Sequence, residues 1–202
     1  MIPHVLSLCL VLSSANDGCV GPSLVQTRRQ RSRVPIALVK THKTGGSTLA
    51  NILFRLAGAQ NSSVMMPSCK EPHKLGYPLA FPGENAQRLH EGSLFDMILN
   101  HAVFNATAFA SFLKPSPFFV SILRQPESQL RSTFNFFDKW TSIDDFVRML
   151  DAGRHEQPVY HYVNFQANDL GFYEAGGRPN SSSEEVKSWI AALKQSFEFP
   201  RG

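Results

Sequence analysis

The residues with the clearest chemical potential lie between 40 and 48, in the run KTHKTGGST. Lys43 carries a full positive charge, the two glycines let the backbone approach a ligand closely, and two hydroxyl groups follow them. If a helix begins within this run, its free amide groups and its dipole also favour an anion. We therefore predict that phosphate or sulfate oxygens are held by Lys43, Thr44, Gly45, Gly46, Ser47 and Thr48. A helix cap beside a solvated lysine is the simpler alternative for the loop alone.

The order of residues in this run differs from that of a nucleoside-triphosphate P-loop. In that motif the lysine directly follows the last glycine and directly precedes Ser or Thr. Here Lys43 precedes both glycines. The run is therefore P-loop-like in composition but indicates a phosphate-binding loop of another class.

Two histidines are candidates for a general base, because imidazole titrates near neutrality and can take a proton from a hydroxyl group. His101 comes directly after an apolar run that ends at Asn100, which would aim it at an acceptor hydroxyl. His42 lies within the 40–48 run and competes for the same role. We favour His101 as the catalytic base and keep His42 as the alternative.

Arg124 is a candidate for binding a second anion. It follows the apolar run 118–123 and precedes a proline turn at Pro126. A guanidinium group can donate two parallel hydrogen bonds to phosphate oxygens. Taken alone, an arginine in this position is more often structural.

The elements that position these residues follow one pattern, which is a strand, a polar residue and a helix. This pattern occurs three times. Short apolar runs predict strands at 36–39, 94–99 and 118–123. The first matching helix begins after the 40–48 run and stops at Gly58. The second covers Ala106–Leu113 and is capped by Asn105. The third covers Glu127–Phe137, with Pro126 in its first turn.

This pattern predicts an α/β fold with a parallel sheet and flanking helices. In open parallel sheets, ligands bind outside the carboxyl ends of the strands. Because the crossovers between parallel strands are right-handed, Lys43, His101 and Arg124 should meet at one edge of the sheet. A lysine, a titratable histidine and an anion-binding arginine would then converge.

The rest of the chain is less regular. Residues 59–93 are rich in Pro and Gly, which predicts a long surface excursion with a short helix at Asn85–His90. This excursion either forms part of the cleft for the acceptor substrate, whose hydroxyl the base would deprotonate, or is a flexible insertion. Ser142–Leu150 begins with a capping pattern, which predicts a short helix. The aromatic segment 160–173 either lines the acceptor site or packs the core. The last predicted helix, Ser183–Phe197, has an apolar face of Val186, Ile190, Leu193 and Phe197.

Composition indicates one globular domain with an N-terminal appendage, since 43% of the 202 residues are hydrophobic and 18% are charged. The net charge of +4 suits anionic ligands. It does not demand nucleic acid, because the basic residues are scattered apart from a cluster at 28–33 that we interpret as a solvated stalk. We divide the chain into 1–33, an apolar segment with this stalk, and 34–202, the domain.

The apolar run Val5–Leu12 is too short to span a membrane, which takes about 20 apolar residues. It fits a signal-peptide core or a shortened signal anchor. Three glycosylation sequons begin at Asn61, Asn105 and Asn180 and are compatible with a lumenal chain. Only Cys69 lies clearly within the domain, so the cysteines predict no disulfide framework, and no spacing of Cys and His matches a metal site.

Several strings resemble one enzyme family. The order Lys-Thr-Gly-Gly-Ser-Thr resembles the 5'-phosphosulfate loop of sulfotransferases that use 3'-phosphoadenosine 5'-phosphosulfate, and LVKTHKTGGSTLANILFR at 38–55 resembles the galactose-3-O-sulfotransferase family, which includes galactosylceramide sulfotransferase. The segment 124–137, RQPESQLRSTFNFF, resembles the 3'-phosphate segment of the sulfotransferases. The segment 100–105, NHAVFN, resembles the family's histidine segment, and the segment 168–172, NDLGF, resembles a further family segment.

The resemblance implies a sulfotransferase fold and transfer of a sulfuryl group from that donor to a galactose 3-hydroxyl. In this interpretation Arg124 and Ser132 grip the 3'-phosphate, and the loop holds the 5'-phosphate. Lys43 neutralises charge on the leaving oxygen, while His101 or His42 takes the acceptor proton. The scheme requires no metal and no nucleic acid.

The acceptor would be a glycolipid or a glycoprotein glycan, and no segment distinguishes the two. The family implies the Golgi lumen, with membrane attachment through the N-terminal segment. The resemblance runs from Val34 to Phe199 and corresponds to the first half or so of a family member's catalytic domain. We therefore expect the C-terminal part of the fold to be missing, and an inactive nucleotide-binding fragment or degenerate paralogue is the alternative function.

Overall fold

The computed structural model describes residues 34–68, 72–82, 92–137, 142, 144–145, 148, 164–178 and 180–197. Within them the chain forms a four-stranded sheet in the order β2-β3-β1-β4, with every neighbouring pair parallel. The strands are β1 (Ile36–Val39), β2 (Val64–Met65), β3 (Met97–Ile98) and β4 (Phe118–Ser121). The prediction of an α/β fold with a parallel sheet is confirmed.

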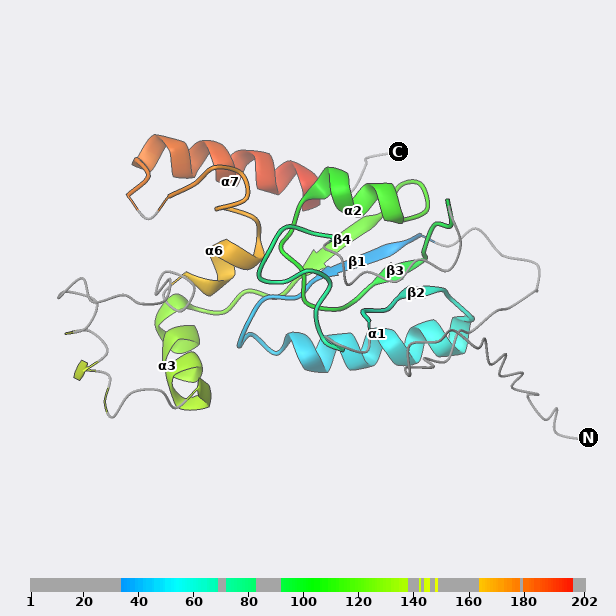
Figure 1. Cartoon of the computed structure of the whole chain (residues 1–202), viewed down its shortest axis with the longest axis horizontal. Coiled ribbons are helices and arrows are strands. Elements are labelled where there is room, and N and C mark those ends of the chain that lie inside the picture. The colour runs from blue at the N-terminus through cyan, green and yellow to red at the C-terminus, as the bar shows by residue number, and fades with distance from the viewer. Residues whose placement is uncertain are drawn as a thin grey trace, which may run out of the picture.

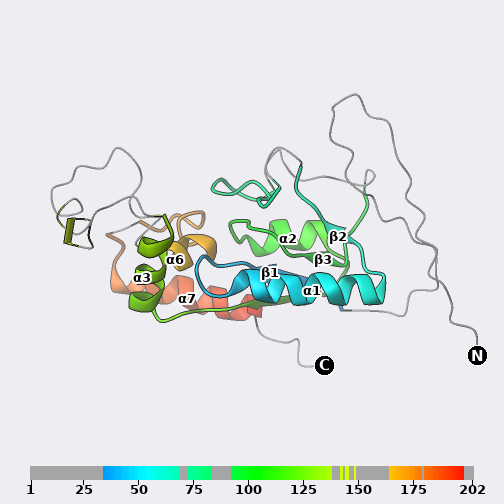
Figure 2. The ribbon, with the colours of Figure 1, turned by 90° about the horizontal axis from the view of Figure 1, so that it is seen from below.

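Helices cover both faces of the sheet and extend beyond one end of it. They are α1 (Gly46–Gln60), α2 (Ala106–Phe112), α3 (Pro126–Phe137), α6 (Phe165–Asp169) and α7 (Ser183–Phe197). In Figure 1, α1 lies along one face, while α2 and α7 lie along the other. Both α3 and α6 lie beyond the end of the sheet at which β1 leads into α1, as Figure 2 also shows.

The side chains of β1 explain this layering. Leu38 packs with Ala50 and Leu53 of α1, while Ala37 and Val39 join the core on the opposite face. Because both faces of the strand are buried, its sequence is continuously apolar rather than alternating.

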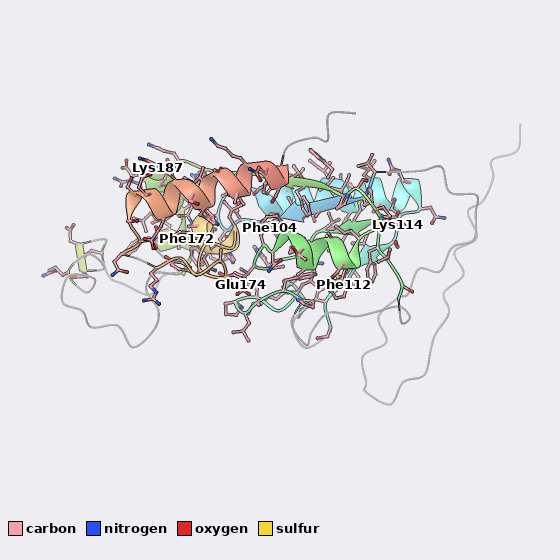
Figure 3. All side chains as sticks on the ribbon, turned by 90° about the horizontal axis from the view of Figure 1, so that it is seen from above. Phe104, Phe112, Lys114, Phe172, Glu174 and Lys187 are labelled. Atoms are coloured by element: carbon pink, nitrogen blue, oxygen red, sulfur yellow. The ribbon has the colours of Figure 1, made fainter. Side chains whose placement is uncertain are left out.

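The core on the α2 and α7 side is aromatic. The ring of Phe104 contacts Phe109 of α2 and Phe197 of α7, with centroid distances of 5.4 Å in each case, and Figure 3 shows Phe104 between these helices. Burying each phenylalanine contributes about 1.5–3 kcal/mol. This cluster therefore holds α2 and α7 against the sheet.

Helix α1 is longer than predicted, since it continues past Gly58 to Gln60. The stop is Asn61, which adopts a left-handed conformation at φ 62° and donates its amide to the carbonyl groups of Ala57 and Gly58. Asparagine tolerates this conformation, and a glycine within a helix costs only about 1 kcal/mol. The prediction of a stop at Gly58 was wrong for this reason.

Two strands are shorter than predicted because their ends bond elsewhere. Before β3, Phe95 pairs with the segment after α2, and the Asp96 amide donates to Ser63. After β4, the carbonyl of Ile122 accepts a hydrogen bond from the Thr41 hydroxyl instead of from a neighbouring strand. The regular strands therefore shrink to 97–98 and 118–121.

The predicted surface excursion at 59–93 was partly wrong. It contains the edge strand β2, and Leu75 and Phe81 are buried in the core. Bridges from Lys74 to His101 and from Ala80 to Val103 bind this segment to the chain after β3. The helix expected at Asn85–His90 lies outside the described residues.

The remaining elements mostly match the sequence. Asn105 caps α2 by accepting the Ala108 amide, and α3 spans the predicted residues with Pro126 in its first turn. The Ser142 hydroxyl accepts the Asp145 amide, as its capping pattern predicted. One correction concerns the inner face of α7: Trp189, Leu193 and Phe197 pack against the core, while Ile190 is 38% exposed.

Among the residues that the structure describes, no helix is long and apolar enough to cross a membrane. The predicted apolar segment and basic stalk at 1–33 lie outside the described part of the chain, as do all three cysteines. The division at residue 33 therefore stays a prediction.

Candidate functional site

The three segments that the sequence predicted to converge do meet at the carboxyl end of the sheet. The ring of His42, in the loop after β1, stacks on the ring of His101, after β3, with centroids 4.3 Å apart and planes at 22°. Nη1 of Arg124, after β4, donates to the carbonyl oxygen of Lys43 at 3.2 Å. The parallel sheet thus brings together residues up to 81 positions apart in the chain.

The loop between β1 and α1 is held by its threonines. Thr41 is buried and donates its hydroxyl to Ile122, while the Thr44 hydroxyl bonds back to Thr41. Lys43 and Gly45 both have left-handed backbones, with φ of 59° and 92°. A lysine in this conformation is strained, and such strain persists only where the surroundings impose it.

The two glycines serve different purposes. A Cβ on Gly45 would meet open space, so the positive φ, and not a lack of room, explains why this residue is glycine. A Cβ on Gly46 would lie 2.9 Å from Cγ of Lys40 and 3.3 Å from the Thr41 carbonyl oxygen, so glycine is required there for close packing. These contacts define the tight turn that leads into α1.

The N-terminus of α1 suits an anion. Its N-cap residue makes no side-chain capping bond, and its first turn contains no acidic residue. Ser47 and Thr48 are exposed at this end of the helix. Free amide groups, the helix dipole and two hydroxyl groups therefore fit an anionic ligand.

Two lysines flank this helix end. Nζ of Lys43 lies 3.7 Å from the centroid of the Phe136 ring on α3, a cation–π contact. Lys40, at the end of β1, runs its stem across Gly46, and burial lowers the pKa of its ammonium group. Lys40 was not among the predicted site residues, although its place directly after a strand was a usable signal.

His42 is the most tightly held side chain of the site. Its backbone amide donates to Oδ2 of Asp169 at 2.6 Å, and its Nδ1 lies 2.9 Å from both carboxylate oxygens. The ring is sandwiched between His101 and Phe165, whose centroid is 4.6 Å away. Tyr77 packs against it at 4.8 Å.

Asp169, which sequence reasoning missed, is fully buried. Burial raises the pKa of its carboxyl group, and the hydrogen bonds and charge of His42 oppose that rise. The only signal in the sequence was its place in NDLGF, a segment that we could not assign between the acceptor site and the core. The structure ties this segment to the loop after β1.

His101 lies in a different electrostatic environment. Its Nδ1 donates to the carbonyl oxygen of Lys40 at 3.1 Å, which leaves Nε2 unprotonated. Burial, followed by the charges of His42 and Lys40, lowers its pKa from 6.5 to about 3. His101 is therefore neutral at physiological pH and a weak base.

Arg124 is fixed by its backbone more than by its side chain. Gln166 of α6 accepts the Arg124 amide and donates to its carbonyl oxygen, both at 2.8 Å. The guanidinium is largely exposed and bonds only to the Lys43 carbonyl among the contacts that the described residues make. Ser132 lies eight residues later on α3 and is partly buried. In the described ranges, no group of three or more His, Cys, Asp or Glu could hold a metal ion.

Comparisons with known proteins found a matching family and similar sequences. The family described as Galactose-3-O-sulfotransferase matches residues 7–199. The chain is 31% identical over 169 residues to human Galactose-3-O-sulfotransferase 2, covering 80% of this chain and 42% of that protein. It is 32% identical over 194 residues to bovine Galactosylceramide sulfotransferase, covering 92% of this chain and 44% of that protein. It is 28% identical to mouse Galactose-3-O-sulfotransferase 3, covering 88% and 42%.

The chain therefore spans less than half the length of these relatives. No solved structure matches it.

Proposed function

The chain belongs to the galactose-3-O-sulfotransferase family, and we propose that it binds 3'-phosphoadenosine 5'-phosphosulfate and transfers its sulfuryl group to the 3-hydroxyl of a galactose. The acceptor is a glycolipid or a glycoprotein glycan. The observation that carries this proposal is the meeting of the N-terminus of α1, two histidines and Arg124 at one edge of a parallel sheet.

In this proposal the donor's 5'-phosphate lies at the N-terminus of α1. The groups that hold it are the amides and side chains of Thr44, Gly45, Gly46, Ser47 and Thr48. The helix dipole and unsatisfied amides favour the negative charge. This assigns a P-loop-like role to a loop whose lysine precedes its glycines.

Arg124 and Ser132 are proposed to hold the 3'-phosphate. Arg124 offers a planar group with several donors, and its exposed guanidinium is free to turn toward a ligand at the cost of one bond to the Lys43 carbonyl. Ser132 lies on the adjacent helix α3. A 3'-phosphate held here would distinguish this donor from ATP.

The donor supplies an activated sulfuryl group, and the chain's residues supply charge and a base. Lys43 is proposed to neutralise the charge that grows on the leaving oxygen, and Lys40, whose stem passes Gly46, is proposed to assist it.

Between the two histidines, the geometry favours His42 as the base over His101. Both rings are neutral acceptors at Nε2 if Nδ1 carries the proton, but a base works best with a pKa near the operating pH. The pKa of His101 is held at about 3 by burial and by nearby positive charge. His42 instead has a carboxylate against Nδ1, an arrangement that orients an imidazole and stabilises it once it accepts a proton.

The compartment proposed is the Golgi lumen, with membrane attachment through the N-terminal segment. Support comes from the family and from the three sequons at Asn61, Asn105 and Asn180. A lumenal enzyme would meet both glycolipids and glycoproteins.

The test of function combines nucleotide binding with sulfate transfer. We expect calorimetry to show much tighter binding of adenosine 3',5'-bisphosphate than of adenosine 5'-monophosphate, and sulfate transfer to galactosides should be detectable. Binding without transfer would support the inactive nucleotide-binding fragment instead. Equal affinity for the two nucleotides would refute the assignment of the donor.

The base is tested by a matched pair of substitutions, His42→Ala and His101→Ala. A general base contributes about 10²- to 10⁴-fold, so His42→Ala should lower turnover by that factor and leave nucleotide affinity nearly unchanged. His101→Ala should have the smaller effect on turnover. The opposite result would return the role to His101.

A further inference from the structure

We infer that Asp169 is a positioning residue that fixes the tautomer and orientation of the His42 imidazole. This inference rests on the proposed function, in which His42 acts as the base. It adds a residue 127 positions downstream of the loop to the catalytic apparatus.

The contacts between Asp169 and His42 leave the ring one orientation. The carboxylate accepts the backbone amide of His42 at 2.6 Å and lies 2.9 Å from Nδ1 through each of its oxygens. A carboxylate accepts hydrogen bonds, so Nδ1 carries the proton and Nε2 keeps its lone pair. The ring is therefore preset as a proton acceptor at Nε2.

Stacking prevents the ring from leaving this orientation. His101 and Phe165 lie nearly parallel to it on two sides, with interplanar angles of 22° and 18°. A flip of the imidazole would break the bonds between Nδ1 and the carboxylate. Hydrogen bonds to a charged partner in a buried site are the strong ones, so this flip is disfavoured.

The exposed fractions of the two side chains indicate that His42 and Asp169 have different roles. The His42 side chain keeps 16% of its surface exposed, whereas that of Asp169 keeps 1%. A substrate can therefore reach the imidazole but not the carboxylate. Asp169 acts on the reaction only through His42.

The alternative is a purely structural role, in which Asp169 only holds α6 against the loop between β1 and α1. Its backbone carbonyl also accepts the Phe104 amide, and Gln166 of the same short helix holds Arg124. A purely structural role would move stability and nucleotide affinity together with turnover. A positioning role would change the tautomer and turnover while leaving nucleotide affinity intact.

The discriminating substitution is Asp169→Asn. The amide oxygen can still accept the His42 backbone N–H, but the amide nitrogen is a donor and would bond to Nδ1 only if Nδ1 has lost its proton. The variant therefore favours the tautomer with the proton on Nε2. Such an imidazole cannot accept a proton from a hydroxyl group at Nε2.

The readout is the tautomer of His42 by ¹⁵N–¹H correlation NMR of the imidazole at mildly alkaline pH, assigned with His42→Gln. We expect the Nδ1–H form in the wild type and a shift toward Nε2–H in Asp169→Asn. Turnover in sulfate transfer should fall about 10²- to 10⁴-fold, and affinity for adenosine 3',5'-bisphosphate should change less than about threefold.

The matched control is Asp96→Asn, which alters another buried carboxylate, bonded to Ser63 and Lys114 rather than to the site. It should lower stability and leave the His42 tautomer unchanged. The inference would be overturned if His42 of the wild-type protein carried its proton on Nε2, a result that does not depend on the stability of Asp169→Asn. Wild-type turnover in Asp169→Asn would also overturn it. Failure of the wild type to bind the bisphosphate would instead refute the proposed function and leave the tautomer result standing.

Discussion

The buried imidazole of His101 should make the stability of this protein fall at mildly acid pH. Burial and the charges of His42 and Lys40 lower its pKa from 6.5 to about 3. The unfolded chain therefore binds a proton as pH falls through 6.5, while the folded protein does not. A depressed pKa of this kind contributes stability that is fully present above 6.5 and is lost as pH falls toward 3.

The magnitude follows from proton linkage. With pKa values of 6.5 unfolded and about 3 folded, His101 should remove about 2.7 kcal/mol from the free energy of unfolding between pH 7.5 and 4.5. At pH 4.5 this loss depends mainly on the unfolded value, because the folded group is still almost entirely neutral.

The comparison that isolates this effect is the wild type against His101→Asn. Asparagine does not titrate, and its amide can still donate to the Lys40 carbonyl that now accepts from Nδ1. Loss of ring volume should lower the variant's stability by a similar amount at every pH. Other groups titrate in both proteins, so their contributions largely cancel in the difference.

The assay is urea unfolding followed by circular dichroism at several pH values from 7.5 to 4.5. We expect the stability of the wild type to fall by about 2–3 kcal/mol more than that of His101→Asn over this range. Parallel stability curves that stay within about 0.5 kcal/mol of a constant offset would show that burial does not keep His101 neutral. His101 would then be protonated in the folded protein at mildly acid pH, which would also remove the argument against it as the base.

Three further predictions concern the ligand, the loop and the compartment. Arg124→Ala should cost about 1.5–3 kcal/mol in binding of adenosine 3',5'-bisphosphate and little in binding of the 5'-monophosphate, as calorimetry of both ligands would reveal. Gly46→Ala should cost about 1–3 kcal/mol of stability and weaken nucleotide binding, because its Cβ would meet Lys40 and the Thr41 carbonyl. The control Gly58→Ala, where a Cβ meets nothing within 4 Å, should be neutral or stabilising by up to about 1 kcal/mol in the same unfolding assay. Expressed in a secreting cell, the full chain should gain mass that an endoglycosidase removes, and a persistently unglycosylated cytosolic product would count against secretory entry.

Most helices and strands, and the direction in which the strands run, could be predicted from the sequence. The continuous apolar run of β1, the glycine turn after it and the Asn105 cap depend on neighbouring residues, and the structure confirms them. The parallel arrangement then required Lys43, His101 and Arg124 to follow strands at one edge. These are local or topological constraints, which spacing along the chain can carry.

Spacing along the chain did not reveal which groups those residues contact. The burial of Leu75 and Phe81, the pairing of β2 at the edge and the inward turn of Trp189 depend on surfaces supplied by distant segments. The same holds for the proposed base: residue type and spacing favoured His101 and left His42 as the alternative. What separates them is that burial beside positive charge disfavours the protonated form of His101, while a carboxylate 127 residues away in sequence lies against Nδ1 of His42. Desolvation and long-range hydrogen bonding are properties of the folded arrangement, so no local pattern could have assigned them.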